Sequence, residues 1–260
     1  MSLFSVEDLN DFILPSQSCI FPATQEPPQK ETPAYEVTVD TKPAKINLTD
    51  CLACSGCITT SESLLVSQQS HLELLKTISQ NQESDTKRTI IVSISPVSLA
   101  SLAAKYRMSA SGLHCRLKTV MTRIGVRYYT GIEHASQISL LESSRYALDR
   151  IRDNQVVVSS VCPGWICYAE KTHPHMLPFL DPTKSPQQIQ GSLLKRAMSN
   201  IWHMCVMPCH DKKLEASRSV FARRGSRDVD CVITTHELDL ILGMHNVQID
   251  REDEGVPDTL

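Results

Sequence analysis

The stretch Ile90-Ile-Val-Ser-Ile94-Ser-Pro96 decides the fold class of this chain of 260 residues. It is a short apolar run that ends at a proline, which cannot continue a sheet ladder, so it predicts a buried strand. Two longer stretches with helical spacing follow it, over residues 97–106 and 112–123. A buried strand followed by helices is the repeating unit of α/β folds.

The same alternation continues towards the C-terminus. Further strands are predicted at Val126–Tyr129, Val156–Val161, Trp202–Met207 and Val229–Ile233, and further helices over residues 136–152 and 185–200. Strands that alternate with helices predict an α/β domain over residues 89–247, with a largely parallel sheet flanked by helices.

The rest of the chain divides into three shorter parts. Residues 62–88 combine a helix, predicted from leucines and an isoleucine at helical spacing, with a polar connector. Residues 1–61 hold a short predicted helix over 4–14 and an irregular arm over 22–45, which contains five of the chain's 14 prolines. Residues 248–260 form an acidic tail.

Composition narrows the class of protein. Hydrophobic residues make up 41% of the chain and charged residues 21%, which is enough apolar side chain for a packed core. The formal net charge of −3 argues against a protein held on nucleic acid mainly by phosphate contacts. No stretch approaches the roughly 20 apolar residues of a membrane helix, and the first residues carry acids where a signal peptide carries a basic region. We expect a cytoplasmic protein without a membrane or nucleic-acid partner.

The chain contains ten cysteines. Because the cytosol keeps thiols reduced, disulfide bonds are not expected to account for them. The segment Cys51-Leu-Ala-Cys54-Ser-Gly-Cys57 has the spacing that wraps three thiolates around one face of an iron–sulfur cubane. Its small residues let the backbone approach the cluster and donate amide hydrogens to it. A fourth ligand must come from elsewhere, and Cys19 is the only other cysteine before residue 115. A zinc site is the alternative, although zinc ribbons usually pair two such knuckles.

Two further cysteines follow predicted strands. Cys162 begins the turn Cys162-Pro-Gly-Trp165 after one strand, and Cys209 lies just after another. Ligands of open α/β sheets bind at the carboxyl edge of the strands, where we expect both thiols. Two thiols at this edge could hold one cofactor between them, while a buried structural cysteine is the alternative for each.

These two segments resemble signature motifs of a known family. The turn Cys162–Trp165 and the segment Met207-Pro-Cys-x-x-Lys-x-x-Glu215 are similar to two of the three motifs of iron-only hydrogenases. Together with Cys19 and the cysteines at 51–57, they resemble the branch of cytosolic iron–sulfur protein assembly factors, also called nuclear prelamin A recognition factor-like. The resemblance covers essentially the whole chain and includes residues 4–13, 166–173 and 211–217.

The resemblance implies two cluster sites and a role. An N-terminal 4Fe-4S cluster would be held by Cys19, Cys51, Cys54 and Cys57. Two of the four ligands of a second 4Fe-4S cluster would be Cys162 and Cys209. The implied function is non-enzymatic: cytosolic and nuclear iron–sulfur cluster assembly, with insertion of 4Fe-4S clusters into extramitochondrial apo-proteins. The implied partners are proteins of the assembly and targeting machinery and apo iron–sulfur proteins.

Two departures from the hydrogenase pattern argue against an enzyme. The position before Cys162, a proton-relaying cysteine in hydrogenases, is Val161, which cannot carry a proton. The third motif, a C-terminal cysteine pair among glycines, is absent, so the chain resembles a C-terminally truncated member. We therefore expect an incomplete second site, with Cys162 and Cys209 facing each other across an open cleft. A redox enzyme related to iron-only hydrogenase is the alternative function. An interaction protein that binds zinc at the N-terminal cysteines, here called the front site, is a third hypothesis.

The remaining candidates have simpler interpretations. Packed thiols are predicted for Cys115, Cys167, Cys205 and Cys231, with Cys205 on the same strand face as Met207. Hydrogen-bonded surface groups, rather than metal ligands, are predicted for His203 and His210. A solvated basic face is predicted for Lys212, Lys213, Arg218, Arg223, Arg224 and Arg227. Charge compensation of a cluster, or docking of an acidic partner, is the functional alternative for that face.

Overall fold

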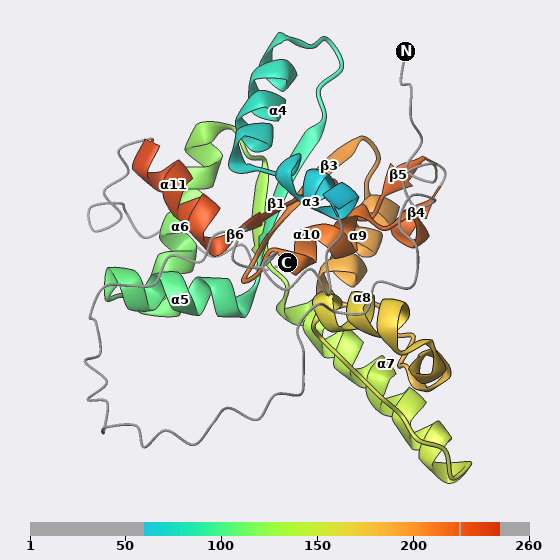
Figure 1. The fold of residues 1–260 in the computed structure, drawn as a ribbon. Coiled ribbons are helices and arrows are strands. Elements are labelled where there is room, and N and C mark those ends of the chain that lie inside the picture. The colour runs from blue at the N-terminus through green and yellow to red at the C-terminus, as the bar shows by residue number, and fades with distance from the viewer. Residues whose placement is uncertain (1–59, 224, 245–260) are drawn as a thin grey trace, which may run out of the picture.

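The computed structural model describes residues 60–223 and 225–244. These residues contain the helices and strands of Figure 1. Several predicted features lie outside the described residues: the helix over 4–14, the proline-rich arm, Cys19, the cysteines at 51–57 and the acidic tail.

A four-stranded sheet organises the fold, in the strand order β2-β1-β3-β6. The strands are β1 (Thr89–Ile94), β2 (Tyr128–Gly131), β3 (Ile201–Met207) and β6 (Cys231–Thr234). All neighbouring strands run parallel, with Ile94 beside Val206 and Met207 beside Thr234. The carboxyl ends of these strands therefore meet at one edge, and the predicted α/β class is confirmed.

Four helices cover one face of the sheet (Figure 1). They are α4 (His71–Glu83), α5 (Pro96–Tyr106), α6 (Ala110–Ile124) and α11 (Thr235–Met244). Their buried leucines and isoleucines pack on alternate strand residues such as Val92, Met204 and Ile233. Ser95 and Ser109 cap α5 and α6 by accepting backbone N–H groups of the first turn. This layer forms the main hydrophobic core.

The other face of the sheet carries a smaller hydrophobic cluster and more polar side chains. Cys205 and Met207 point to it together, beside Val232, because side chains of a strand alternate between faces. They pack with Ala216 of α10 (Asp211–Ser217), while α9 (Pro186–Ala197) packs against β3. The predicted pairing of Cys205 with Met207 on one face is confirmed.

The helix predicted from residue 62 onward is divided into α3 (Thr60–Ser67) and α4. Gln69, in the turn between them, is buried. Its Nε2 donates to the carbonyl oxygen of Lys213 at 2.8 Å and to Ser217 Oγ at 2.7 Å, and its Oε1 accepts the Val232 N–H at 3.0 Å. These hydrogen bonds fix the two helices to α10 and β6.

The prediction of a strand at Val156–Val161 is wrong. Val158 alone forms a parallel bridge, with Leu180, after the 3-10 helix η1 (Pro174–Phe179). The run follows α7 (Glu133–Arg152), which extends away from the sheet (Figure 1), so it begins far from any strand. Val156 and Val161 are 65% and 76% exposed. An apolar run shows that a segment favours extension, but only the topology decides whether a partner strand lies beside it.

The remaining elements are short. They are α8 (Pro163–Thr172), the 3-10 helix η2 (Ser219–Phe221) and the antiparallel pair β4 (Ala222–Arg223) and β5 (Ser226–Arg227). The pattern of the sequence did not predict α8, α10 or α11, because helices of two to three turns carry too little periodicity.

Candidate metal centre

Cys209 lies in the turn between β3 and α10, at the carboxyl edge of the sheet as predicted. Its thiol is half-buried, and the backbone N–H groups of Lys212 and Asp211 hydrogen-bond to its sulfur. Burial raises the pKa of the Cys209 thiol and outweighs these hydrogen bonds, which lower it. A thiolate at this place therefore needs a compensating positive charge, which a metal ion supplies.

Cys162 is the residue immediately before α8, and its side chain is exposed. Its backbone N–H donates to Ser160 Oγ at 3.2 Å, and Ser160 Oγ lies 3.3 Å from the Cys162 carbonyl oxygen. Pro163 occupies the first position of the helix, where its fixed φ is suitable. The Cys162 thiol therefore lies in a turn at the start of a helix. The prediction that it follows the end of a sheet strand is wrong.

The turns that carry Cys162 and Cys209 lie against each other. Helix α8 packs against α10, and a Cβ added at Gly164 would lie 2.9 Å from Asp211 Oδ2. Gly164 comes two residues after Cys162, and Asp211 comes two residues after Cys209. Only glycine allows this approach without moving the Asp211 carboxylate. The structure therefore brings together the two segments that the sequence singled out.

Two buried polar atoms of the Cys209 turn have no hydrogen-bond partner, His210 Nδ1 and Asp211 Oδ1. Buried polar atoms in proteins are normally paired, so both atoms remain able to accept a hydrogen bond from a further group. Thiols are the ligands of iron–sulfur clusters, and two are present here. Over residues 60–223 and 225–244, however, no three His, Cys, Asp or Glu side chains gather as a metal site requires. The described residues thus supply two cysteines on adjacent turns and no complete set of metal ligands.

The other described cysteines are packed or partly packed. Cys167, Cys205 and Cys231 are buried, and Cys115 is half-buried on α6. Burial raises the pKa of the Cys231 thiol to about 12 and that of Cys205 still further. Such thiols stay protonated and make poor metal ligands. The predicted packing is confirmed for the three buried cysteines.

His203 is a fully buried residue of β3, so its prediction as a surface group is wrong. Its Nε2 lies 2.9 Å from Ser93 Oγ and 3.5 Å from Cys205 Sγ, and its Nδ1 lies 3.4 Å from the Asp228 carbonyl oxygen. Burial lowers the pKa of His203 to about 4. The position of His203 within the strand does not reveal whether its face of the sheet is covered by a helix. In the structure, α9 covers that face. His210 is half-buried.

The predicted basic face is also corrected in part. Lys212 and Lys213 are 4% and 3% exposed, and each is neutralised by a carboxylate. Lys212 Nζ lies 2.6 Å from Glu215 Oε2, and Lys213 Nζ lies 2.8 Å from Glu237 Oε2. The Lys212–Glu215 spacing of three residues was the available signal, since such residues are neighbours on a helix. For Lys213, the partner Glu237 comes from α11, which the sequence alone could not indicate.

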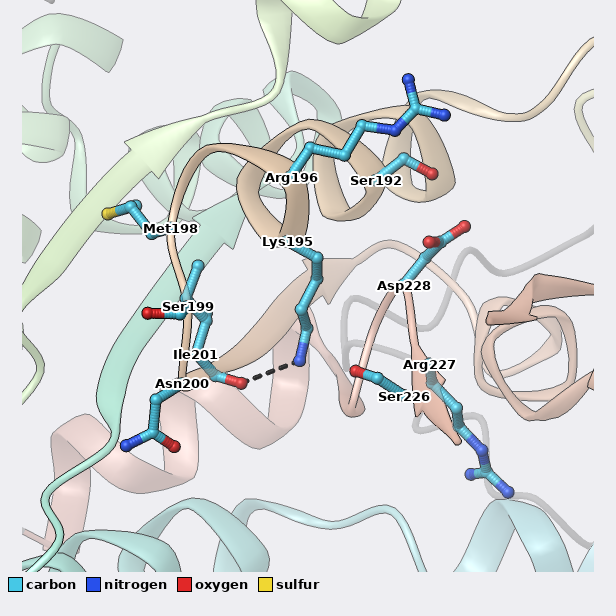
Figure 2. Close-up of a pocket in the computed structure, with 10 residues that line it drawn as sticks. All are labelled: Ser192, Lys195, Arg196, Met198, Ser199, Asn200, Ile201, Ser226, Arg227 and Asp228. Carbon is cyan, nitrogen blue, oxygen red and sulfur yellow. Dashed lines mark hydrogen bonds between the residues drawn. The ribbon is translucent and has the colours of Figure 1, made fainter. Parts of the chain in front are cut away.

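A cavity of about 630 Å³ lies at the opposite edge of the sheet, where β3 begins (Figure 2). Lys195 Nζ donates to the Ile201 carbonyl oxygen at 2.8 Å and pairs with Asp230 at 2.6 Å. The guanidinium groups of Arg196 and Arg227 point away from each other in Figure 2. The cavity thus offers no convergent set of free charges, and it lies away from Cys209, which follows the other end of β3.

Within the part of the chain that the structure describes, no helix combines the length and the apolar character needed to cross a bilayer.

Comparisons with known proteins agree with the motifs. The family model described as "Iron only hydrogenase large subunit, C-terminal domain" matches residues 88–260. The rat protein "Cytosolic iron-sulfur assembly component 3" is 40% identical over 284 residues, which cover 96% of this chain and 60% of the relative. The Yarrowia lipolytica protein "Cytosolic Fe-S cluster assembly factor NAR1" is 40% identical and covers 99% of this chain and 60% of its own length. The chain thus spans about 60% of these relatives.

Solved structures give the same fold. The FeFe-hydrogenase HydA1 from Chlamydomonas reinhardtii matches with a TM-score of 0.65 over 73% of this chain and 51% of the hydrogenase, at 23% sequence identity. At that identity the likeness concerns the fold. The family model covers most of the chain and includes both cysteine turns at the α8–α10 contact. The chain belongs to the family of the iron-only hydrogenase large subunit, C-terminal domain.

Proposed function

We propose that this chain is a non-enzymatic iron–sulfur protein of cytosolic and nuclear cluster assembly. It mediates insertion of 4Fe-4S clusters into extramitochondrial apo-proteins. Two relatives at 40% identity carry names of cytosolic assembly components. The observation that carries the proposal is the contact between the Cys162 and Cys209 turns, through Gly164 and Asp211.

In this proposal the front cluster is held by Cys19, Cys51, Cys54 and Cys57, and a second, incomplete cluster site is formed by Cys162 and Cys209. A bound cluster supplies transferable iron and sulfide and can accept an electron. Iron coordination replaces the thiol proton, which burial otherwise retains on Cys209. The N–H groups of Asp211 and Lys212 orient the Cys209 sulfur and stabilise its negative charge.

The non-enzymatic part of the proposal is based on Val161. This side chain is 76% exposed and directly precedes Cys162. An alkyl group cannot pass a proton, and proton transfer to a metal requires a titratable relay. The partners in this proposal are proteins of the assembly and targeting machinery and apo iron–sulfur proteins, with both cytoplasm and nucleus as locations.

Iron and sulfide content, with electron paramagnetic resonance on anaerobically purified protein, test the proposal. About four irons per chain indicate the front cluster alone, and about eight indicate both clusters. Cys54→Ala should remove the iron and the visible charge-transfer band of the front cluster, because each thiolate completes the coordination of one iron. Cys19→Ala tests the distant ligand in the same way, and Cys115→Ala is the matched control.

Three results would contradict the assignment. Iron content that survives in the Cys54→Ala variant would show that the assignment of the front site is wrong. Stoichiometric zinc in place of iron would show that the front site is a zinc site. Cys162 and Cys209 sulfur atoms more than roughly 10 Å apart in an experimental structure exclude a shared cluster, since thiolates at ~2.3 Å from a compact metal core must converge. Loss of cytosolic 4Fe-4S enzyme activity in cells that carry only Cys54→Ala would support the assembly role.

A further inference from the structure

The hairpin of β4 and β5 carries a serine in a basic stretch of sequence. Residues 223–226 read Arg-Arg-Gly-Ser, so two arginines lie three and two positions before Ser226. Protein kinases select their substrates partly by the charges beside the hydroxyl group, and basophilic serine/threonine kinases accept arginine at these two positions. Part of the predicted basic face thus has the pattern of a kinase substrate.

The structure leaves this serine accessible. Ser226 is exposed, and it follows a turn in which Gly225 has a φ of +79°. A Cβ added at Gly225 would meet no atom of the described residues within 4 Å, so the turn projects into open space. β4 and β5 form a two-stranded sheet of their own, separate from the four-stranded sheet. A kinase can therefore bring the Ser226 hydroxyl to its catalytic aspartate without opening the core.

Ser226 also lines the cavity of about 630 Å³ at the start of β3. In Figure 2 its hydroxyl group points towards the ammonium group of Lys195, which lines the same cavity. Lys195 Nζ donates to the Ile201 carbonyl oxygen at 2.8 Å and to Asp230 Oδ2 at 2.6 Å. Because an ammonium group has three donors, one N–H of Lys195 remains for a further acceptor.

Two arginines add positive charge around this cavity. Arg196 and Arg227 line it, are exposed and have no ion-pair partner among the described residues. The carboxylate in the cavity wall, Asp228, is paired with Lys184. The arginines do not converge in the unmodified protein, but long exposed side chains can turn towards an anion, and arginine binds phosphate through two parallel hydrogen bonds. The cavity therefore suits an anionic group attached to Ser226.

We propose that Ser226 is a phosphorylation site of a basophilic serine/threonine kinase and that this cavity receives the phosphate. The kinase transfers the γ-phosphoryl group of ATP to Ser226 Oγ. The bond from that phosphorus to ADP breaks, the new Oγ–P bond forms, and the hydroxyl proton passes to the catalytic aspartate of the kinase. The product carries a charge of about −1.5 to −2 and three acceptor oxygens. Lys195 and Arg196 donate to these oxygens and hold the hairpin against α9.

Phosphorylation of the full chain with ATP and the catalytic subunit of cyclic-AMP-dependent kinase tests the site. We expect the protein to gain the mass of one phosphoryl group, and fragment-ion spectra to place it on Ser226. Ser226→Ala should lose this gain. Ser219→Ala is the matched control, because Ser219 is an exposed serine with Ala216 and Ser217 in place of the two arginines. Replacing both Arg223 and Arg224 by alanine should lower kcat/KM of the kinase about tenfold.

Two results would overturn the site. One is a native chain that gains no phosphoryl group, and the other is a gain that persists in Ser226→Ala. The substituted serine is exposed and makes no contact with the core, so loss of the gain in this variant is not a folding defect.

Phosphorus NMR of the phosphorylated chain tests the receiving cavity. The second pKa of a phosphoserine is about 6 and should fall to about 5 in the folded protein, because neighbouring cations favour the dianion. It should return to about 6 in urea. Arg196→Gln should remove about half of the decrease, while Arg152→Gln, on the distant helix α7, should leave it unchanged. Equal values in the folded and unfolded chains would overturn docking in the cavity. Neither experiment depends on iron, so both are independent of the proposed function.

Discussion

Gln69 and Lys213 hydrogen-bond each other in both directions. Gln69 Nε2 donates to the Lys213 carbonyl oxygen at 2.8 Å, and Lys213 Nζ donates to the Gln69 carbonyl oxygen at 2.7 Å. The pair joins the turn between α3 and α4 to α10, the helix that begins two residues after Cys209. The element that follows the front cysteine motif is therefore fixed to the element that follows the second cysteine turn.

Gln69→Leu should lower the free energy of unfolding by about 3 kcal/mol, because it leaves buried groups without their partners. The Lys213 carbonyl oxygen and the Val232 N–H both lose a hydrogen bond to this side chain. Gln68→Leu is the matched control, since Gln68 is the exposed neighbour in the same turn. Urea denaturation measures both variants. Equal stability of the two would show that the turn is not fixed by Gln69.

Lys212→Met should destabilise the fold by about 3 kcal/mol, because it leaves the Glu215 carboxylate buried without its cation. The double variant Lys212→Met with Glu215→Gln should regain most of that loss, since no charge remains buried. A double-mutant cycle from thermal unfolding gives the coupling. Additive effects of the two substitutions would contradict a direct pair. Gln187 Nε2, which donates to the Lys212 carbonyl oxygen at 3.1 Å, stays in place in both variants.

Acid should destabilise the protein through His203. Its pKa is about 4 in the fold and about 6.5 when unfolded, so only the unfolded chain takes up the proton between these values. The contribution of His203 to the free energy of unfolding is therefore constant above about pH 6.5 and falls by about 3 kcal/mol as the pH drops to 4. His203→Gln should keep a polar contact to Ser93 and lose this part of the slope. Parallel pH profiles of the two proteins would refute the assignment.

Hydrogen turnover should be undetectable with a reduced dye, even in protein with full iron content. Val161 gives no titratable group beside Cys162, and a proton relay needs one. Val161→Cys should not restore activity either, because the third hydrogenase motif is not in this sequence. Gas chromatography of the headspace is the measurement. Hydrogen above the level of a Cys209→Ala control would mean that the protein is a redox enzyme.

The strands β1 and β3 could be predicted within one residue, and β2 and β6 within two. Short apolar runs that end at proline or a polar turn are local signals, and burial on both faces of a parallel sheet produces them. The same signal failed at Val156–Val161, where no strand among the described residues lies alongside. The extended tendency is local, but the neighbour that makes it a sheet strand comes from the path of α7.

The sequence by itself determined the α/β class, the cysteine motifs and their order, because periodicity, chain order and thiol chemistry are properties of the residues. Only the tertiary structure decided that the turns of Cys162 and Cys209 touch through Gly164 and Asp211. It also decided that Lys212 and His203 are internal. Burial and contact depend on which distant segment packs on a residue, and hydrophobic packing, which is non-directional, selects that segment only when the whole domain folds.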